Sequence, residues 1–127
     1  MHTTFAKVAL LCTTLIGVTS STVLAHHSYA MFDRDTVSTV QGTIAKVEWV
    51  NPHVLFWAYV SNGKGGHDLY GFESASVSGL ARQGWTMSTL KAGDKVTIDY
   101  NPLRDGRTGG FFVSATFADG SKTPGGG

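Results

Sequence analysis

The feature of this sequence that most limits its possible folds is a series of short segments rich in β-branched and aromatic residues. Each segment has the length of a β-strand, and residues that favour turns, mostly glycine, asparagine and proline, lie between them. The five segments are residues 37–50, 54–60, 67–73, 95–100 and 111–117. With 127 residues in the whole chain, we expect a single domain built mainly of β-strands.

The first segment is expected to bend sharply. Val40 and Ile44 share one face of an extended strand, whereas Ala45 and Val47 share the other. Such a change of phase beside Gly42 is typical of a β-bulge. The segment should end at the following Asn-Pro pair, because proline has no N–H to donate to a sheet.

A short helix is predicted between the third and fourth strands. Ser74 or Ser76 can cap its N-terminus, and the helix should reach about Gln83, with Gly84 as the left-handed residue that ends it. The expected buried stripe of the helix consists of Val77, Leu80 and Ala81.

The order strand, strand, strand, helix, strand, strand, with a bent first strand, predicts a small five-stranded OB-like Greek-key barrel over residues 37–120. A β-sandwich is the alternative, because hydrophobic periodicity does not distinguish the two. Alternation predicts one shared face in each of the last two strands. These faces are Val96, Ile98 and Tyr100 in one, and Phe111, Val113, Ala115 and Phe117 in the other. Residues 121–127 are expected to be a frayed tail.

The first 25 residues have the layout of a cleavable signal peptide. Lys7 precedes the uncharged, mostly apolar run 8–18, and small residues lead to a cut after Ala25. The apolar run is shorter than the roughly 20 residues that span a bilayer. An uncleaved anchor over residues 8–25 is the alternative. We therefore expect an exported chain with an N-terminal segment at 26–36 and no membrane span after cleavage.

Cleavage would also remove Cys12, the single cysteine, so neither a disulfide nor a thiol mechanism is expected. The whole chain has 10 basic and 9 acidic residues, and losing Lys7 leaves 9 of each. A net charge of zero disfavours charge-driven nucleic-acid binding.

Several sequence blocks occur in an order that resembles a known family. They are HHSYAMFD (26–33), EWVNPH (48–53), GW (84–85), GDKV (93–96) and NPLRDG (101–106). The chain is similar in these blocks to DUF6152, a family of small exported bacterial proteins of unknown function. The resemblance implies an exported β-barrel domain without a settled activity, and it supplies no catalytic residues.

The two histidines after the predicted cut suggest a metal site. His26 would present a free α-amine and an imidazole, and His27 follows it. Imidazole suits Cu(II), Zn and Ni, so copper is the candidate cofactor. His53 and His67 are further candidate ligands. The alternative is a tail that happens to contain two histidines, because no spaced ligand set supports the site.

A second candidate site lies in two loops. An OB barrel places Asn51 and His53, in the loop after the first strand, near the loop that carries Arg104, Asp105 and Arg107. Together they could hold an anionic or polar small ligand. In the structural alternative, Asn51 caps the turn and His53 bonds a backbone carbonyl.

A third candidate is an aromatic surface. Trp57 and Tyr59 in the second strand and Tyr70 and Phe72 in the third could form one stacking platform. The alternatives are packing beneath the N-terminal segment or a protein contact.

These observations favour a non-enzymatic, periplasmic binding module for a small polar ligand or an envelope partner, because the sequence lacks recognisable catalytic motifs. The candidate ligand contacts are Asn51, His53, Arg104, Arg107, Trp57 and Tyr70. The first alternative is a periplasmic copper-binding protein that uses His26, His27 and His53. The second is a structural envelope protein whose sheet edge pairs with a partner strand.

Overall fold

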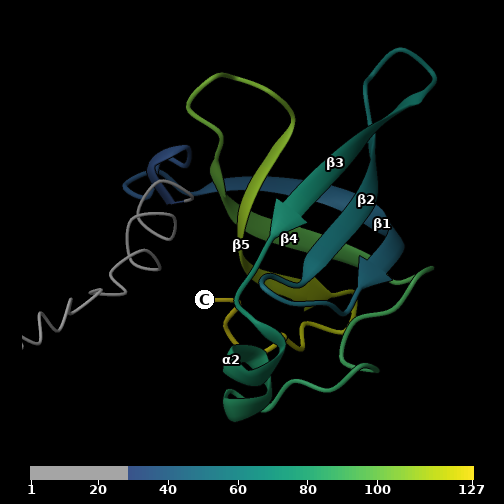
Figure 1. Cartoon of the computed structure of the whole chain (residues 1–127). Coiled ribbons are helices and arrows are strands. Elements are labelled where there is room, and N and C mark those ends of the chain that lie inside the picture. The colour runs from purple at the N-terminus through teal and green to yellow at the C-terminus, as the bar shows by residue number, and fades with distance from the viewer. Residues whose placement is uncertain (1–28) are drawn as a thin grey trace, which may run out of the picture.

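The computed structural model describes residues 29–127 (Figure 1). The predicted signal peptide, its cut and both N-terminal histidines lie outside this range. The elements are β1 (Ser38–Glu48), β2 (Leu55–Ser61), β3 (His67–Glu73), α2 (Val77–Arg82), β4 (Lys95–Pro102) and β5 (Gly109–Phe117). Within the described range, no helix is long and apolar enough to cross a membrane.

The five strands form a closed barrel in the order β1-β2-β3-β5-β4. This confirms the prediction of a mainly β, five-stranded barrel with one short helix between the third and fourth strands, and it is compatible with an OB-like topology. The alternative of an open β-sandwich is wrong. Four of the strand contacts are antiparallel, and β3 pairs with β5 in parallel over three residue pairs.

The bend predicted for β1 is present and lets this strand join both sides of the barrel. Its register against β2 shifts between Ile44 and Lys46, as a bulge requires. The first half of β1 pairs with β4 and the second half pairs with β2, and Gly42 belongs to both ladders. A Cβ atom at Gly42 would lie 2.8 Å from the carbonyl oxygen of Tyr59, so the close approach requires glycine.

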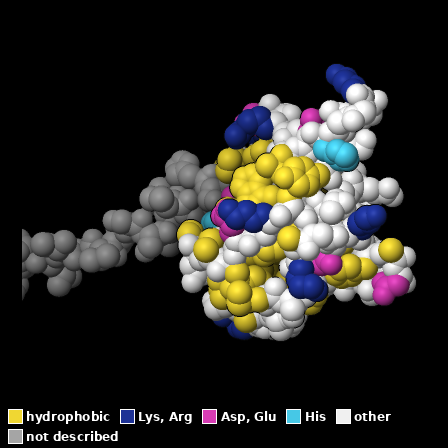
Figure 2. Space-filling view, turned by 90° about the vertical axis from the view of Figure 1, so that its right-hand side faces the viewer, with side chains coloured by type: hydrophobic (Ala, Val, Ile, Leu, Met, Phe, Trp, Pro, Cys, Tyr) yellow, Lys and Arg dark blue, Asp and Glu magenta, His cyan; other side chains and the backbone are white. Residues whose placement is uncertain are grey.

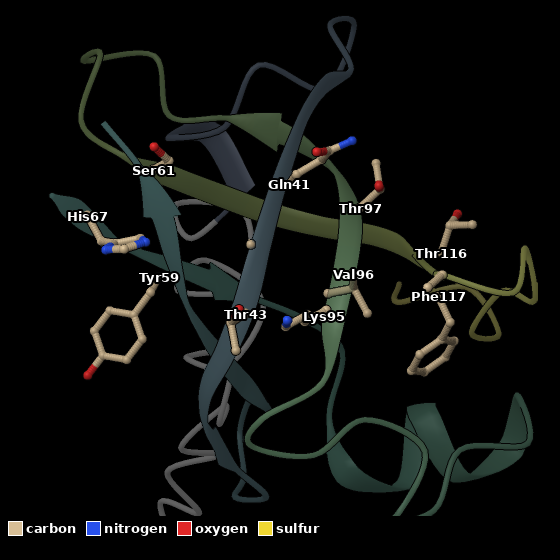
Figure 3. Close-up of a pocket in the computed structure, with 12 residues that line it drawn as sticks. Gln41, Thr43, Tyr59, Ser61, His67, Lys95, Val96, Thr97, Thr116 and Phe117 are labelled. Carbon is tan, nitrogen blue, oxygen red and sulfur yellow. The ribbon is translucent and has the colours of Figure 1, made fainter. Parts of the chain in front are cut away.

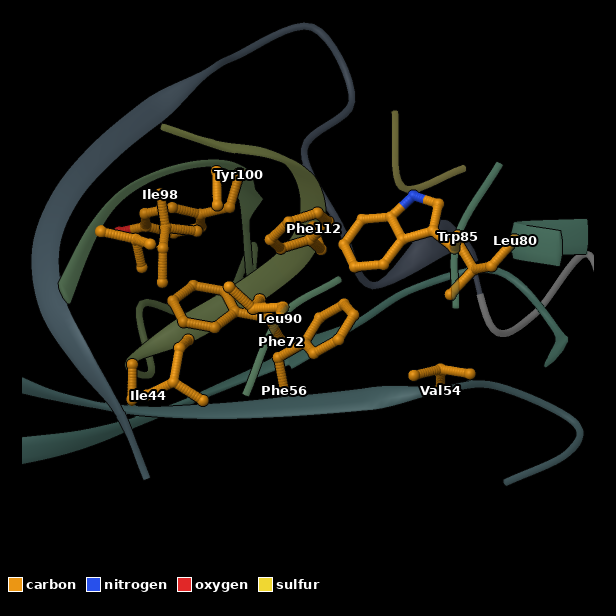
Figure 4. Close-up of a cluster of buried hydrophobic side chains, with 13 residues drawn as sticks. Ile44, Val54, Phe56, Phe72, Leu80, Trp85, Leu90, Ile98, Tyr100 and Phe112 are labelled. Carbon is orange, nitrogen blue, oxygen red and sulfur yellow. The ribbon is translucent and has the colours of Figure 1, made fainter. Parts of the chain in front are cut away.

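The barrel interior is filled mainly by aromatic and branched side chains (Figure 4). In this view, Ile98 and Tyr100 lie at one end of the cluster, and Trp85 and Leu80 lie at the other. The predicted shared face of the fourth strand is confirmed, since Val96, Ile98 and Tyr100 are all buried. Burial, together with the nearby Tyr70, raises the pKa of the Tyr100 hydroxyl above its ordinary value.

The predicted shared face of the fifth strand is wrong in its first half, at Phe111 and Val113, whereas Ala115 and Phe117 do pack on the core. Asp99 pairs with Ser114 and Tyr100 pairs with Phe112, so Val113 is an extra residue between them. This irregularity changes the phase of β5. Phe112 and Ala115 therefore enter the core cluster, whereas Phe111 packs against Phe32 with 5.6 Å between ring centroids.

The helix has the predicted ends, with Gln83 as its C-cap and Gly84 at a positive φ, but it buries fewer residues than predicted. Ser76 is its N-cap, and the Ser76 hydroxyl accepts a hydrogen bond from the backbone N–H of Gly79. Leu80 is buried, but Ala81 is exposed, which corrects the predicted stripe. Trp85, just after the helix, is buried and stacks on Phe56 at 5.4 Å. A six-residue helix followed by an indole therefore closes this end of the barrel.

The C-terminal residues are bound to the barrel and do not form the frayed tail expected for 121–127. The N–H groups of Thr123 and Gly126 donate to the carbonyls of Ala115 and Val113 in β5. The carbonyl of Gly126 accepts from the N–H of Ala75, and Nε1 of Trp85 donates to the carbonyl of Gly125. The tail thus connects the edge of β5 to the segment around α2.

Replacing Thr123 with valine tests the role of the tail. The Thr123 hydroxyl accepts the buried N–H of Ala115 at 3.0 Å, and Thr123→Val keeps the side-chain shape but removes this acceptor. We expect a loss of about 1–3 kcal/mol in the free energy of unfolding measured in urea. The control, Ser121→Ala at an exposed position, should change it by less than about 0.5 kcal/mol. Equal effects of the two variants would contradict an ordered tail.

Candidate functional site

The β2–β3 pair presents two chemically different faces. Trp57 lies opposite Gly71, and Tyr59 lies opposite Leu69. Tyr70 and Phe72 alternate with these residues and face the barrel interior, where Phe72 is buried and Tyr70 packs against the core. The predicted platform of Trp57 and Tyr59 with Tyr70 and Phe72 is therefore wrong, because the two pairs point to opposite sides of the sheet.

A hollow of about 450 Å³ lies over the outer face of β2 and β3. Its apolar lining consists mainly of Met31, Leu55, Trp57, Leu69 and Leu103. Its polar lining includes Glu73, Arg107 and Thr108. Figure 2 shows hydrophobic side chains gathered on this side of the molecule, with Lys and Arg side chains around them. A mostly apolar concavity with a few polar groups is typical of small-molecule sites.

Trp57 forms the floor of this hollow because the residue opposite it has no side chain. A Cβ atom at Gly71 would lie 2.7 Å from Cζ3 of the Trp57 ring, so the indole rests directly against the β3 backbone. Within residues 29–127, the indole N–H of Trp57 is the one buried side-chain polar group without a hydrogen-bond partner. Such an unsatisfied group costs free energy and calls for an acceptor.

One wall of the hollow is built from the N-terminal segment and the β4–β5 loop. Phe32 forms an isolated bridge with Leu103. The N–H of Arg104 donates to the carbonyl of Met31, and its Nε donates to the carbonyl of Ala30. Arg104, a candidate ligand contact, thus holds the N-terminal segment against the barrel.

Arg107 lies in the same loop and lines the hollow. Its Nε donates to a carboxylate oxygen of Asp105 at 2.8 Å, and both side chains are exposed. Hydrogen bonds from the Arg107 backbone and side chain hold the pKa of Asp105 below its ordinary value. The loop therefore presents a paired, solvated cation at the edge of the hollow.

Asn51 is placed against the helix. Its side-chain oxygen accepts the backbone N–H of Val77 at 3.1 Å, and this N–H belongs to the first turn of α2. Three of the four loop residues predicted as ligand contacts are thus bound to different elements. Asn51 is bound to α2, Arg104 to the N-terminal segment and Arg107 to its own loop.

His53 lies next to the hollow and is paired with a carboxylate. Its Nδ1 is 2.6 Å from Oε1 of Glu73, and the two side chains are 26% and 21% exposed. The Tyr29 ring meets the His53 ring edge to face, with 6.3 Å between centroids. Glu73 also lines the hollow, so it links the imidazole to the apolar surface.

His67 lies at the opposite end of β3 from Glu73. Six residues of extended strand separate the two by roughly 20 Å, so His67 is not a neighbour of His53. No group of three or more His, Cys, Asp and Glu side chains among the residues described could hold a metal ion. His53 and Glu73 supply two such side chains at one place.

A second hollow, of about 400 Å³, lies over the outer face of β1 and its neighbours (Figure 3). Its polar lining includes Gln41, Thr43, Ser61, His67, Lys95, Thr97 and Thr116. Figure 3 shows these side chains spread to both sides of β1 and not directed at one point. We therefore regard the hollow over β2 and β3 as the candidate site.

Sequence reasoning missed Leu69, Gly71 and Glu73 as parts of the site. The available signal was Gly71, because a glycine inside a strand marks a place where another group approaches closely. The pairing of Glu73 with His53 had no comparable signal, since 20 residues separate them and only the strand register brings them together.

Comparison with known proteins gives one match. A family model described as "Family of unknown function (DUF6152)" matches residues 14–113. Neither the curated proteins nor the solved structures contain a match to the chain.

Gly71→Ala tests whether Trp57 rests on β3. An open strand position would gain stability from this change, by about 0.5–1 kcal/mol. Here the added methyl group meets the indole, so we expect a loss of about 1–3 kcal/mol and a shift of the Trp57 indole N–H resonance in NMR spectra. Gly66→Ala is the control, because its methyl group would meet only the Asn62 side chain. A stabilising Gly71→Ala would contradict the contact.

Proposed function

The chain belongs to the DUF6152 family, whose function is unknown, and from this starting point we propose that it is a non-enzymatic binding module for a small amphipathic ligand. The ligand would place an apolar body against Trp57 and Leu69, in the hollow over β2 and β3. The observation that carries the proposal is the apolar hollow whose floor is an indole with an unpartnered N–H, among the residues described.

The chemistry of the lining defines the ligand class. Burial of apolar surface supplies about 25 cal/mol per Å², and the apolar side chains that line the hollow offer most of the contact. The polar groups at its edge, Arg107, Thr108 and Glu73, would fix the orientation of a polar end. This revises the sequence-based expectation of a small polar ligand.

The residues expected to contact the ligand are also revised. Trp57 and Arg107 stay as proposed contacts because they line the hollow. Asn51 and Arg104 serve in the proposal as structural residues, because their side chains bond α2 and the N-terminal segment. Tyr70 faces the barrel interior and is therefore no longer a proposed ligand contact.

The proposal includes export to the periplasm. It is supported by the layout of the first 25 residues, with a basic residue, an apolar run and small residues before the cut. An envelope protein that presents an apolar side chain would use the same surface, so such a partner is the second form of the binding proposal.

Leu69→Asp tests the binding proposal, with dodecanoate as the probe in isothermal titration calorimetry. Leu69 is 49% exposed, so the variant should fold, but a carboxylate would replace part of the apolar wall. We expect the dissociation constant to rise at least tenfold, which is a loss of about 1.4 kcal/mol in binding free energy. The matched control is Met87→Asp, at a methionine that is 72% exposed and not part of the hollow's lining. Unchanged affinity in Leu69→Asp would refute this site.

A second candidate function, copper binding by His26, His27 and His53, is favoured by one observation. Tyr29 contacts the His53 ring, and it follows His27 by two residues. The first residue that the structure describes thus lies beside His53. Protein cleaved after Ala25 should bind one Cu(II) with nitrogen hyperfine structure in its EPR spectrum. One extra residue before His26 should alter that signal if the α-amine is a ligand, and an unchanged signal would exclude amine ligation.

A further inference from the structure

We propose that the candidate site has a second subsite, on the other side of Trp57, and that this subsite binds an uncharged sugar. The ligand class is then a glycoside, in which an apolar body and a sugar are joined. The inference rests on the proposed binding function, which places the apolar body in the hollow over β2 and β3.

A further hollow, of about 380 Å³, adjoins the candidate site over the outer face of β1 and β2, and we call it the adjoining hollow. Trp57 and Leu69 line both hollows, so the two meet at these side chains. The other residues that line the adjoining hollow are Ala45, Lys46, Glu48 and Tyr59. The bulge of β1 shapes this hollow, because Ala45 is the extra residue between Ile44 and Lys46 in the register against β2.

The unpartnered indole N–H of Trp57 lies on the side of its ring away from β3. The ring atoms nearest to a Cβ atom at Gly71 would be Cζ3, Cε3 and Cη2. These carbons form the edge of an indole that is farthest from Nε1, so Nε1 is turned away from Gly71. On the β1 side of β2, the register partner of Trp57 is Lys46, which lines the adjoining hollow. A ligand group in this hollow would supply the acceptor that the buried N–H lacks among the residues described.

The charges of the adjoining hollow are balanced, which favours an uncharged ligand group. Nζ of Lys46 forms an ion pair with Oε1 of Glu48. A carboxylate that approached Lys46 would also meet Glu48, and an ammonium group that approached Glu48 would also meet Lys46. Burying a charge without a partner of its own costs free energy. A hydroxyl group both donates and accepts hydrogen bonds, so a group with several hydroxyls can bond the carboxylate, the ammonium group and the indole N–H.

The aromatic side chains of this hollow suit the ring of a sugar. Trp57 and Tyr59 are two residues apart in β2, so both lie on the outer face of the sheet. A sugar ring has C–H groups on its faces and hydroxyl groups around its edge, so it can contact an aromatic ring while its hydroxyls bond the polar walls. Lys46 and Tyr59 are surface side chains, 64% and 51% exposed, and a change of rotamer would admit the sugar to the indole N–H.

The test compares octyl β-glucoside with octanoate in isothermal titration calorimetry, each below its micelle concentration. The two compounds have similar alkyl chains, so a variant that affects them differently reports on the head group. Glu48→Ala should weaken binding of the glucoside by about threefold to tenfold, the effect of one lost hydrogen bond, and should not weaken binding of octanoate. The matched control is Asp35→Ala, at an exposed carboxylate outside both hollows, which should change neither affinity.

The indole N–H resonances in NMR spectra give a second measurement on the unaltered protein. Octyl glucoside should move the Trp57 resonance downfield, because this N–H gains an acceptor. The Trp85 resonance is the internal control, since its N–H already donates to the carbonyl of Gly125 at 2.8 Å. Trp57→Phe assigns the resonance. This measurement needs no variant of the adjoining hollow, so it decides the question even if Glu48→Ala has a lower melting temperature.

The outcomes distinguish this inference from the function on which it rests. Wild-type protein that binds neither octyl compound would overturn the proposed binding function itself. If both compounds bind, an unmoved Trp57 resonance would overturn the sugar subsite. A loss in Glu48→Ala that is equal for the glucoside and octanoate would overturn it too, and the ligand would then be confined to the hollow over β2 and β3.

Discussion

The barrel closes where β3 meets β5, and this contact depends on glycine. A Cβ atom at Gly109, where φ is +95°, would overlap the carbonyl oxygen of Gly71 in β3. Glycine at position 109 therefore lets β5 approach Gly71 of β3, and the two strands pair over three residues. The outer side of Gly71 also seats the Trp57 ring. The same constraint therefore closes the barrel and forms the floor of the candidate site.

Both terminal segments of the described chain are bound to the outside of the closed barrel. The C-terminal tail runs along β5 and reaches Trp85, which packs on the core end near α2. The N-terminal segment bridges to Leu103 and forms a wall of the hollow. Because the segment that builds this wall also contacts His53, the proposed ligand hollow and the proposed metal site share one support.

The sequence predicted the strands, the bulge in β1 and the barrel because local residue preferences and the core requirement agree there. The sequence-based predictions failed where strand register decides which way a side chain points. The extra residue at Val113 changes the phase of β5, and strict alternation cannot show that. Trp57 and Tyr70 both belong to aromatic segments, yet pairing places them on opposite faces. The tail 121–127 looked frayed because its partners, in β5 and beside α2, are distant in the sequence or weakly patterned.

The sequence by itself determined where strands, turns and the helix form, because β-branched and aromatic residues, glycine and proline act on their own neighbourhood. It also identified His53, Trp57 and Arg107 as candidate ligand contacts. Only the tertiary structure decided what these residues face. His53 meets Glu73, Trp57 rests on Gly71, and Asn51 and Arg104 bind backbone groups. The physical reason is that side-chain partners across a closed sheet are set by strand register and closure, which depend on contacts summed over the whole barrel.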